Sequence, residues 1–574
     1  IYDRDDLEDV QLTLRDTPGV SVIIYDQICA TEKRRRSKRG LRAPDRTRVI
    51  INTEVCEGCG DCSVKSNCLS VEPVETDLGR KRRINQSTCN TDLSCLKGFC
   101  PSFVTITDGE AAWEDQERPA FSADGLPLPE TPSLAQPYNV LFTGVGGTGV
   151  TTVAAVLAMA AHVDGHAASS LDMTGLAQKG GPVLSHIRFA REPDQISTGR
   201  VPPASADVVI ACDLVVAAGG DALNLMDADR TAAYANSDVT PTSEFIRNRS
   251  KRFESDLLSA RVKRQATEFD TFDAEALAMG YLHDAIYTNM IMAGFAWQRG
   301  RLPVSLRALY RAIRLNGTKV DDNMAAFNIG RIAAADPDRL IRQQDPRGDV
   351  PEQTLEELIE DRAARLTGYQ NAAYADRYRD IVAKVRAAEK PISTDGKLTR
   401  AAAFYAYKVM AYKDEYEVAR LYTDGKFAKQ LASQFKGGKL RFWLAAPMIA
   451  KKDADGHLEK KHFGPWMLLG FKLLAKFKGL RGTKLDLFGY TEERQHERKL
   501  RDDYLAGLER ITSELTEKNL ELAIAIARVP DDIRGFGHVK DDALQAAKVK
   551  EAELWKGWPE GKLPTTKTTL IAAE

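Results

Sequence analysis

The chain of 574 residues lacks the features that mark several classes of protein. It has no run of about 18 uncharged apolar residues, so we expect no membrane-spanning helix. Its opening, IYDRDDLEDV, has no basic segment followed by an apolar one, so we expect no signal peptide. Lys and Arg number 80 and Asp and Glu 81, so no excess charge favours nucleic acid or a membrane as partner. We expect a globular, cytoplasmic protein of three or four domains.

Cysteine is scarce and unevenly distributed. The chain has 9 Cys, and all but two of them lie between Cys56 and Cys100. In a chain without an export signal, such crowding favours metal or redox chemistry over a disulfide framework. The other two, Cys29 and Cys212, each end an apolar segment, and we expect inert buried thiols there.

The first cysteine set has the spacing of a ferredoxin. Cys56, Cys59 and Cys62 form C-x2-C-x2-C, and the distant Cys100 is followed directly by Pro101. Bacterial ferredoxins use C-x2-C-x2-C-x3-C-P, and in two-cluster versions the fourth Cys ligates the other cluster. We therefore predict a [4Fe–4S] cluster on Cys56, Cys59, Cys62 and Cys100.

The second set departs from this spacing in two ways. Between Cys89 and Cys95, Asp92 occupies the middle position where a ferredoxin has Cys, and Cys68 stands six residues after Cys62 rather than four. Carboxylate is a harder ligand than thiolate and binds this iron less strongly. We predict a second cluster on Cys68, Cys89, Asp92 and Cys95, either [4Fe–4S] or [3Fe–4S]. Zinc is the alternative, because paired C-x2-C motifs also build zinc sites.

A glycine-rich turn follows a predicted strand. The strand is 138–143, the turn is Gly144–Gly149 (GVGGTG), and an Ala-rich helix is predicted over 150–163. A helix N-terminus after such a turn offers N–H groups to an anion. Val150 stands where a Walker A motif needs Lys, and Asp164 and Asp172 are poorly placed for the ribose of NAD. We predict a phosphate-binding loop, with these candidate contacts there and in the segment TGLAQKGGP: Gly144, Gly146, Gly147, Thr148, Gly149, Gln178, Lys179 and Gly180.

The distribution of apolar segments and helical patterns along the chain indicates a multidomain α/β protein. Apolar segments at 21–29, 167–171 and 208–212 predict strands. The other strands of the sheet to which 21–29 would belong are absent and the first residue is Ile, so we expect the chain to be a fragment. Helical periodicity predicts helices in 353–388, 399–421 and 498–528, and we expect Trp466–Lys478 to pack its apolar face within a helical domain. The predicted parts are the end of a preceding domain with a basic segment (1–45), a ferredoxin-like two-cluster module (46–110), a linker (111–137), a doubly wound α/β domain with a parallel sheet (138–339) and a mostly helical C-terminal domain (340–574).

Three segments in a fixed order carry a resemblance to a known family. They are CEGCGDCSVKSNCLS, FTGVGGTGVTT and LAQKGGPV. With them, the chain resembles the 2-oxoacid:ferredoxin oxidoreductases, and among these the fused indolepyruvate:ferredoxin oxidoreductases. Residues 51–102 are similar to the ferredoxin-type insert of that family, 138–336 to its gamma domain, and the helical tail to the C-terminal extension of fused bacterial members. The opening residues resemble the end of its thiamine-diphosphate-binding domain.

The resemblance implies a reaction and a division of labour. An arylpyruvate, with indolepyruvate expected, is oxidatively decarboxylated to acyl-CoA and CO2, and electrons pass through the clusters to ferredoxin. Thiamine diphosphate and Mg would be bound by an N-terminal part, so this chain would be the electron-transfer and acyl-acceptor half, with no catalytic residue of its own assigned. CoA would contact the glycine loop and the 178–180 segment. The expected partners are that N-terminal part, ferredoxin, CoA and further copies of the chain.

Two points stay open in the sequence. The basic run Lys33–Arg42, with Lys81–Arg83, is either a solvated or intersubunit face or a surface that steers acidic ferredoxin. The alternatives to the whole interpretation are an iron–sulfur subunit linked to NAD(P)H or flavin, and a zinc-stabilised interaction module.

Overall fold

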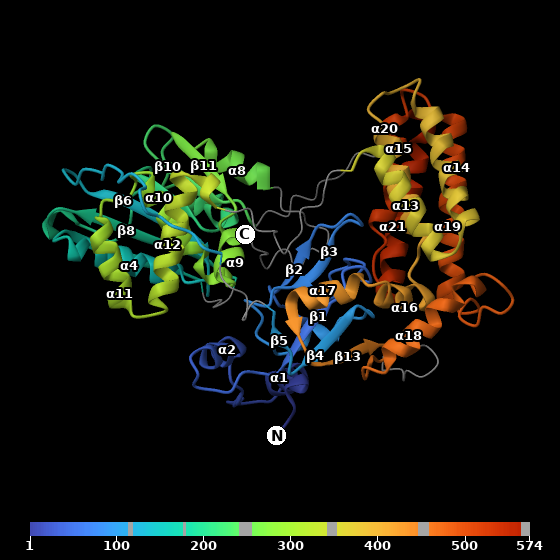
Figure 1. Ribbon diagram of the computed structural model, residues 1–574, viewed down its shortest axis with the longest axis horizontal. Coiled ribbons are helices and arrows are strands. Elements are labelled where there is room, and N and C mark those ends of the chain that lie inside the picture. Colours follow the sequence, from blue (N-terminus) through green and yellow to red (C-terminus); the bar gives the residue numbers. More distant parts are fainter. Residues whose placement is uncertain (113–118, 176–179, 240–254, 341–352, 446–457, 564–574) are drawn as a thin grey trace. The chain divides into compact units, whose positions relative to one another are not determined.

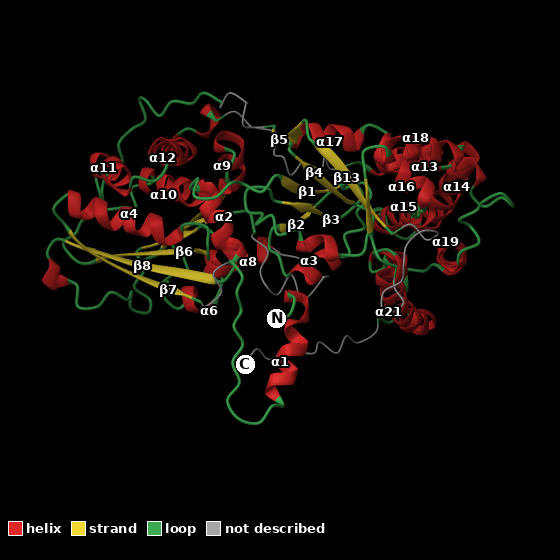
Figure 2. Ribbon diagram, turned by 90° about the horizontal axis from the view of Figure 1, so that it is seen from below, coloured by secondary structure: helices red, strands yellow, loops and turns green. Residues whose placement is uncertain are grey.

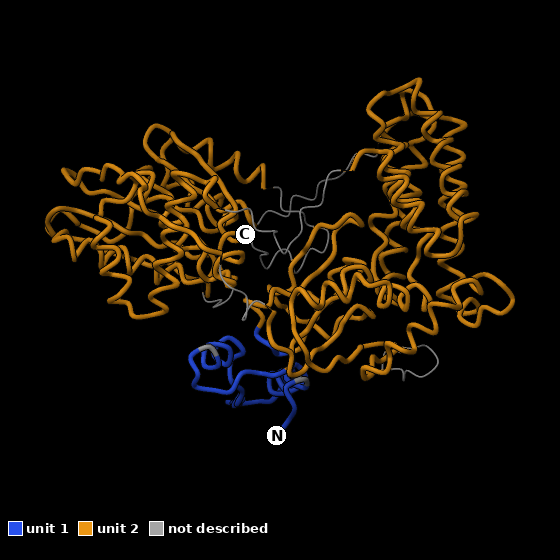
Figure 3. Tube along the Cα trace, viewed as in Figure 1, with its two compact units in different colours: residues 1–46, 90–92 blue, residues 47–89, 93–574 orange. Residues whose placement is uncertain are grey.

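The computed structural model describes residues 1–112, 119–175, 180–239, 255–340, 353–445 and 458–563. The chain divides into two compact units (Figure 3), one of residues 1–46 with 90–92 and one of the remainder. No helix among these residues combines the length and the apolar character needed to cross a bilayer.

The smaller unit contains two short helices and no strand among its described residues. They are α1 (Leu7–Arg15) and α2 (Ala30–Lys38), preceded by the 3-10 turn η1 (Arg4–Asp6). The strand predicted over 21–29 is wrong: the segment is irregular and exposed, and so is Cys29, which is therefore not a buried thiol. A strand needs a hydrogen-bonding neighbour, and the described part of this unit supplies none. The basic run is held through Asp45, which pairs with Lys33 at 2.9 Å and Arg42 at 3.2 Å.

The cysteine-rich module is built on a four-stranded antiparallel sheet of order β1-β4-β13-β14 (Figure 1). Alternate residues of β1 and β4 face different cores: Ile50, Val104 and Ile106 lie in one, and Val49, Ile51 and Phe103 in the other. Two of its strands come from beyond residue 430, which sequence periodicity did not reveal. The strands and short helices are β1 (Thr47–Ile51), α3 (Asp61–Ser66), β2 (Val71–Val74), β3 (Lys81–Ile84), η2 (Ser94–Lys97), β4 (Phe103–Thr107), β5 (Glu110–Ala111), β12 (Phe435–Lys436), β13 (Lys439–Leu444) and β14 (Lys461–Phe463).

The α/β domain has a six-stranded mixed sheet of order β11-β10-β9-β6-β8-β7. The strands β6, β9, β10 and β11 are parallel, whereas β8 is antiparallel to both β6 and β7. The prediction of a wholly parallel sheet is therefore wrong for residues 167–171: only seven residues separate β7 from β8, too few for a crossover. The strands are β6 (Tyr138–Val145), β7 (Ala167–Thr174), β8 (Pro182–Ala190), β9 (Val208–Ala211), β10 (Ala232–Asn236) and β11 (Glu268–Phe272).

Apolar residues fill both faces of this sheet. Val140, Phe142 and Ile210 belong to a large core with α4, α10 and α12, whereas Leu141 and Val209 belong to a smaller one on the opposite face. Figure 2 shows α4, α10, α11 and α12 together on one side of β6 and β8. The helices are α4 (Val150–Val163), η3 (Pro193–Gln195), α5 (Leu214–Ala217), α6 (Gly220–Leu223), α8 (Ser255–Lys263), α9 (Ala274–Leu282), η4 (Ala285–Tyr287), α10 (Thr288–Gln298), α11 (Leu306–Asn316), α12 (Val320–Ala335) and η5 (Pro337–Arg339).

The C-terminal region is helical apart from β12 to β14. The predicted long helices are interrupted where capping residues start a new one: Asn371 caps α14 and Asp414 caps α16 through bonds to backbone N–H groups. Asp414 also forms a buried ion pair of 2.5 Å with Arg481. The helices are α13 (Leu355–Tyr369), α14 (Ala372–Glu389), α15 (Lys397–Met410), α16 (Glu415–Thr423), α17 (Lys426–Gln434), α18 (Met467–Lys476), η6 (Phe477–Leu480), α19 (Glu492–Glu514), α20 (Leu520–Ala527), η7 (Val529–Asp531), α21 (Gly537–Gly557) and η8 (Trp558–Glu560).

Candidate cluster site and glycine loop

The first cysteine set converges on the start of α3. Gly60 begins this helix with a φ of 77°, in the left-handed region that glycine adopts most readily. The carboxylate of Asp61 accepts a hydrogen bond of 2.7 Å from the backbone N–H of Phe99, next to Cys100. Gly98 packs so closely that a Cβ there would lie 2.6 Å from the Cα of Cys62. The segment that carries Cys100 is thereby held against the helix that carries Cys62.

The four thiols of this set lie within electrostatic reach of one another. Burial, followed by the neighbouring Cys100, raises the pKa of Cys59 to about 12. Burial, followed by Cys100, Cys59 and Cys56, also raises the pKa of Cys62. A group of buried thiols that disfavour one another's ionised forms needs a positive partner to become thiolates, and iron supplies one. The donor set therefore fits an iron–sulfur cluster.

Among the described residues, no group of three or more His, Cys, Asp or Glu side chains is arranged to hold a single metal ion. The ligands of a cluster of several irons are spread more widely than those of one ion.

Two cations, the buried Arg82 and the half-buried Lys460, lie beside these thiols. Arg82 is 1% exposed; burial lowers its pKa, and the thiolates of Cys62, Cys56 and Cys59 oppose that shift. Lys460 donates to the carbonyl of Gly98 and lies 4.6 Å from the ring centroid of Phe103. Because Lys81 and Arg82 are buried, the part of the steering hypothesis that rests on Lys81–Arg83 as a surface is wrong.

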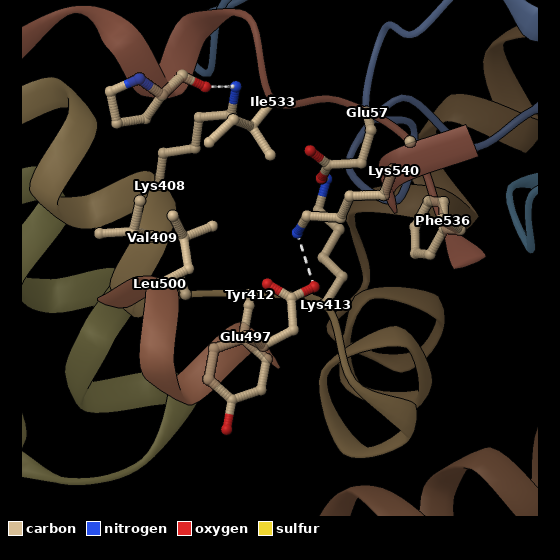
Figure 4. Close-up of a pocket in the computed structure, with 13 residues that line it drawn as sticks. Glu57, Lys408, Val409, Tyr412, Lys413, Glu497, Leu500, Ile533, Phe536 and Lys540 are labelled. Carbon is tan, nitrogen blue, oxygen red and sulfur yellow. Dashed lines mark hydrogen bonds and ion pairs between the residues drawn. The ribbon is translucent and has the colours of Figure 1, made fainter. Parts of the chain in front are cut away.

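Charged residues of the helical region lie near Glu57, the residue after Cys56 (Figure 4). Lys413 pairs with Glu57 at 2.5 Å and donates to the carbonyl of Cys56 at 3.2 Å. Glu497 and Lys540 pair at 2.6 Å, and Lys408 donates to the carbonyl of Pro530, also at 2.6 Å. The sequence analysis missed these residues, because nothing in their local spacing distinguishes them from the many other charges on those helices.

The second cysteine set is only partly assembled by the described contacts. Cys68, Cys89 and Cys95 all pack on the core that also contains Cys56 and Cys62. The N–H of Cys89 donates to the carbonyl of Asn85 at 3.0 Å. Asp92 belongs to the smaller unit, so its role as a ligand stays a prediction.

The glycine loop has the predicted strand-turn-helix form. β6 ends at Val145, and Gly149, with a φ of 93°, caps α4. Gly144 cannot carry a side chain, since a Cβ would lie 2.5 Å from Val150 Cγ2. The loop is braced internally: the N–H of Gly146 donates to Gly181 at 2.8 Å, and the hydroxyl of Thr148 donates to the Val145 carbonyl at 2.7 Å.

A cavity of about 120 Å³ adjoins Gly149 at the end of this loop, and one of its lining residues, Lys319, is a cationic residue that sequence patterns did not indicate. Its lining includes Gly149, Thr152, Tyr287, Lys319 and Asn323. Lys319 has a φ of 42° at the start of α12, a left-handed conformation that is uncommon for a residue with a side chain. Six other non-glycine residues among those described share a positive φ, so it is the position of Lys319 in the cavity lining that draws attention to it.

The second glycine-rich segment is described only in part. Gln178 and Lys179 lie outside the described residues. Gly180, with a φ of 78°, donates its N–H to the carbonyl of Gly146 at 3.4 Å, so the structure places it beside the glycine loop. His186 is buried and accepts a hydrogen bond of 3.2 Å from the N–H of Val201, as expected for a core histidine.

The two acids considered for the ribose of NAD have other partners. Asp172 accepts a hydrogen bond of 2.5 Å from Ser185 within the β7–β8 hairpin. Asp164 accepts from both the N–H and the hydroxyl of Ser305, at 2.6 and 2.7 Å. In addition, β7 is not the parallel neighbour of β6 that the dinucleotide motif requires. These contacts weigh against NAD at the loop.

Comparison with known families covers two parts of the chain. Residues 139–333 match the family model "Pyruvate ferredoxin/flavodoxin oxidoreductase". The resemblance to the 2-oxoacid:ferredoxin oxidoreductases is confirmed over this domain. Residues 355–553 match a family described as one of unknown function, DUF6537. The oxidoreductase-type domain contains the glycine loop, whereas the cysteine sets lie outside both matched ranges.

Curated relatives match about a third of the chain. The indolepyruvate oxidoreductase subunit IorB of Pyrococcus horikoshii is 29% identical over 202 residues, 34% of this chain and 96% of that protein. The IorB subunit of Thermococcus kodakarensis is 28% identical, again over 34% of this chain and 96% of that protein. A gamma subunit common to the pyruvate and ketoisovalerate oxidoreductases of Pyrococcus furiosus is 28% identical over 31% of this chain and 84% of that protein.

Two solved structures also match about a third of the chain. A keto/oxoacid ferredoxin oxidoreductase gamma subunit from Geobacter sulfurreducens is 18% identical, with a TM-score of 0.25, over 34% of this chain and 98% of that one. The pyruvate oxidoreductase subunit PORC from Thermotoga maritima is 19% identical, with a TM-score of 0.25, over 34% of this chain and 96% of that one.

Proposed function

We propose that this chain is the electron-transfer and acyl-acceptor part of a thiamine-dependent 2-oxoacid:ferredoxin oxidoreductase. The substrate we expect is an arylpyruvate, indolepyruvate in particular, which is converted to acyl-CoA and CO2. The single observation that carries the proposal is the convergence of Cys56, Cys59, Cys62 and Cys100 in a chain that also carries an oxidoreductase-type domain. A thiol group of this kind serves one-electron chemistry, which is what ferredoxin-linked oxidation of a ketoacid requires.

The residues of the chain have two tasks in this proposal. The first cysteine set would hold one cluster and Cys68, Cys89, Asp92 and Cys95 a second, and the clusters supply one-electron storage and transfer. The protein around them sets the energy of that transfer through burial and charge. Arg82, which is buried, and Lys460 lie near the thiols and so favour the more negative, reduced state.

The second task is to accept the acyl group. CoA would approach the N-terminus of α4 next to Gly149, where backbone N–H groups and Lys319 offer positive charge to its phosphates. Lys179 would add a further cation. The thiamine diphosphate and Mg would be bound by the N-terminal part of the enzyme, in which decarboxylation takes place.

Metal analysis of anaerobically purified full-length chain tests the first task. We expect about eight irons with matching acid-labile sulfide, or about seven with a [3Fe–4S] EPR signal before dithionite is added. About four irons would restrict the chain to the first cysteine set. Zinc without sulfide would overturn the redox function and support the zinc-stabilised module instead.

Kinetics with the N-terminal part supplied test the second task. The chain alone should not turn over indolepyruvate, whereas the assembled enzyme should reduce ferredoxin in a CoA-dependent reaction. Lys179→Ala should raise the apparent constant for CoA about tenfold, which corresponds to about 1.4 kcal/mol. An unchanged constant would remove Lys179 from the CoA site.

A further inference from the structure

One helix of the C-terminal region exposes an apolar face. Trp466, Leu469, Leu473 and Phe477 follow one another at spacings of three and four along α18 and its ends, so they share one side of the helix. Their exposed fractions are 62%, 71%, 60% and 46%. The expectation that this stretch packs its apolar face within the helical region therefore holds only for its other side, where Phe471 is buried. An exposed apolar stripe of this size marks an interaction surface.

The segment that carries this stripe has charges of one sign only, and Glu415 and Glu493, acidic residues of other elements near it, both pair with Arg494. From residue 460 to residue 485 the sequence contains no Asp or Glu. Lys472, Lys476 and Lys484 are exposed there, and none of them forms an ion pair with any residue that the structure describes. An apolar centre with a basic rim fits a partner whose own contact surface has an apolar centre and an acidic rim.

The buried side of α18 is connected to the first cysteine set by two aromatic rings. Phe471 stacks on Tyr422, with 5.0 Å between ring centroids and 5° between ring planes. The hydroxyl of Tyr422 donates a hydrogen bond of 2.7 Å to the carbonyl of Pro101, the residue after Cys100. A continuous packed path thus runs from the exposed helix to a predicted cluster ligand.

A cavity lies between α18 and the segment that carries Cys100. It has a volume of about 510 Å³ and is lined mostly by apolar groups, among them Cys100, Pro101, Phe471, Leu473 and Phe477. Two residues of the exposed stripe therefore share one cavity wall with Cys100. The exposed stripe and the thiol of Cys100 therefore border the same cavity.

We propose that the exposed face of α18 is the docking surface for a small acidic electron-carrier protein, and that the electron leaves through the Cys100 side of the cluster site. This inference rests on the proposed function. In the step itself, a reduced cluster loses one electron and the oxidised carrier gains it, with no bond made or broken and no proton transferred. The source of the electron is the oxidation of the 2-oxoacid.

The position of the stripe favours a redox carrier over other occupants. A membrane or a second copy of the chain would gain from apolar surface and lysines wherever these lay. Only an electron carrier needs them over a cluster ligand. Carrier complexes are also transient and small, below about 1,200 Å² of buried surface, and one helix face with a basic rim is enough to form one.

The test compares two charge-reversed variants of the full chain. Lys472→Glu/Lys476→Glu alters the docking face, and Lys548→Glu/Lys556→Glu makes the same charge change at exposed lysines of α21. Each protein is reduced with dithionite, desalted, and mixed in stopped flow with an oxidised, purified bacterial ferredoxin of net negative charge. We expect the second-order rate at low salt to fall tenfold or more in the first variant and less than twofold in the second.

Further measurements distinguish a docking defect from a loss of the clusters or of their redox activity. Iron content and the rate of methyl viologen reduction should be unchanged in both variants, because neither depends on docking. Leu469→Gln, which removes apolar surface and changes no charge, should also slow ferredoxin reduction. Equal rates of ferredoxin reduction in wild type and both charge variants would overturn the docking surface. The proposal would also fail if wild type bound anionic lipid vesicles and the first variant lost that binding while it still reduced ferredoxin at the wild-type rate. A wild-type chain without iron and sulfide would instead overturn the proposed function.

Discussion

Gly98 lies against Cys62 so tightly that no side chain fits between them. A Cβ on Gly98 would come within 2.6 Å of the Cys62 Cα and 2.8 Å of its Cβ. Both atoms belong to Cys62 at the start of α3, so this helix cannot move without moving Cys62. The glycine therefore sets the distance between the helix with Cys62 and the segment with Cys100.

Gly98→Ala should accordingly impair cluster assembly. We expect iron per chain to fall by half or more, because the two segments that supply the first ligand set are pushed apart. The matched control is Gly479→Ala, since a Cβ at Gly479 meets no atom within 4 Å. Full iron content in Gly98→Ala would show that the segment adapts and that this contact does not position the thiols.

Asp92→Cys should change the type of the second cluster. A thiolate binds iron of a cluster more strongly than a carboxylate does, so a fourth Cys should retain the iron that Asp92 holds weakly. Where wild type holds about seven irons, we expect about eight in the variant, with loss of the [3Fe–4S] EPR signal before reduction. Where wild type already holds about eight, we expect the same iron content and a changed EPR spectrum of the reduced cluster, because one ligand has changed. The same iron content and the same spectra before and after reduction in wild type and variant would contradict the assignment of Asp92.

Lys460→Met should lower the reduction potential of the cluster site. The ammonium interacts with Cys100, Cys62 and Cys95, thiols from both predicted sets. Its removal disfavours the more negative, reduced state by tens of millivolts, which for one electron corresponds to about 1–2 kcal/mol of lost charge interaction. EPR-monitored redox titration measures this shift, and Lys460→Arg, which keeps the charge, is the control. A potential in Lys460→Met that matches wild type would exclude this role.

Lys408 should make the stability of the helical region depend on pH above neutrality. Burial, followed by Arg534, lowers the pKa of Lys408 to about 7, and Glu57 and Asp531 only partly oppose this. In the unfolded chain the pKa of Lys is about 10.4. Between these values the unfolded state binds a proton that the folded state does not, so the contribution of Lys408 to the free energy of unfolding rises with pH.

Urea unfolding of wild type and Lys408→Met at pH 7, 8 and 9 measures this contribution. The difference in unfolding free energy, wild type minus variant, should increase by at most about 1.4 kcal/mol per pH unit for a single group. Lys556→Met, at an exposed lysine, should show no such trend. A difference that is constant from pH 7 to 9 would mean that Lys408 stays charged in the fold.

Local patterns in the sequence predicted the local features well. The strand before the glycine turn, the turn and the helix after it all form, because residues close in the chain determine them through backbone conformation. The breaks inside the long C-terminal helices occur at capping residues such as Asn371. These residues are visible in the sequence, but a prediction from hydrophobic periodicity alone does not take them into account. The oxidoreductase family of residues 139–333 also followed from short motifs in their order.

Pairing between distant segments was beyond these patterns. Ser21–Cys29 has the composition of a buried strand, yet it is exposed and irregular, because composition does not supply a neighbouring strand. The short link between β7 and β8 could have revealed their antiparallel pairing, whereas the pairing of β13 with β4 joins residues more than 300 positions apart. Sequence periodicity carries no information about such partners.

The sequence by itself determined which chemistry is available: its cysteine spacing supplies the thiols, and its glycine turn supplies the N–H groups. Only the tertiary structure decided which charges surround the thiols and where they meet the surface. Lys413 and Lys460 reach the cysteine module from loops beyond residue 390, and α18 is joined through Phe471 and Tyr422 to Pro101, the residue after Cys100. Electrostatic and packing interactions act through space, so the residues that adjust a site need not be near it in the chain.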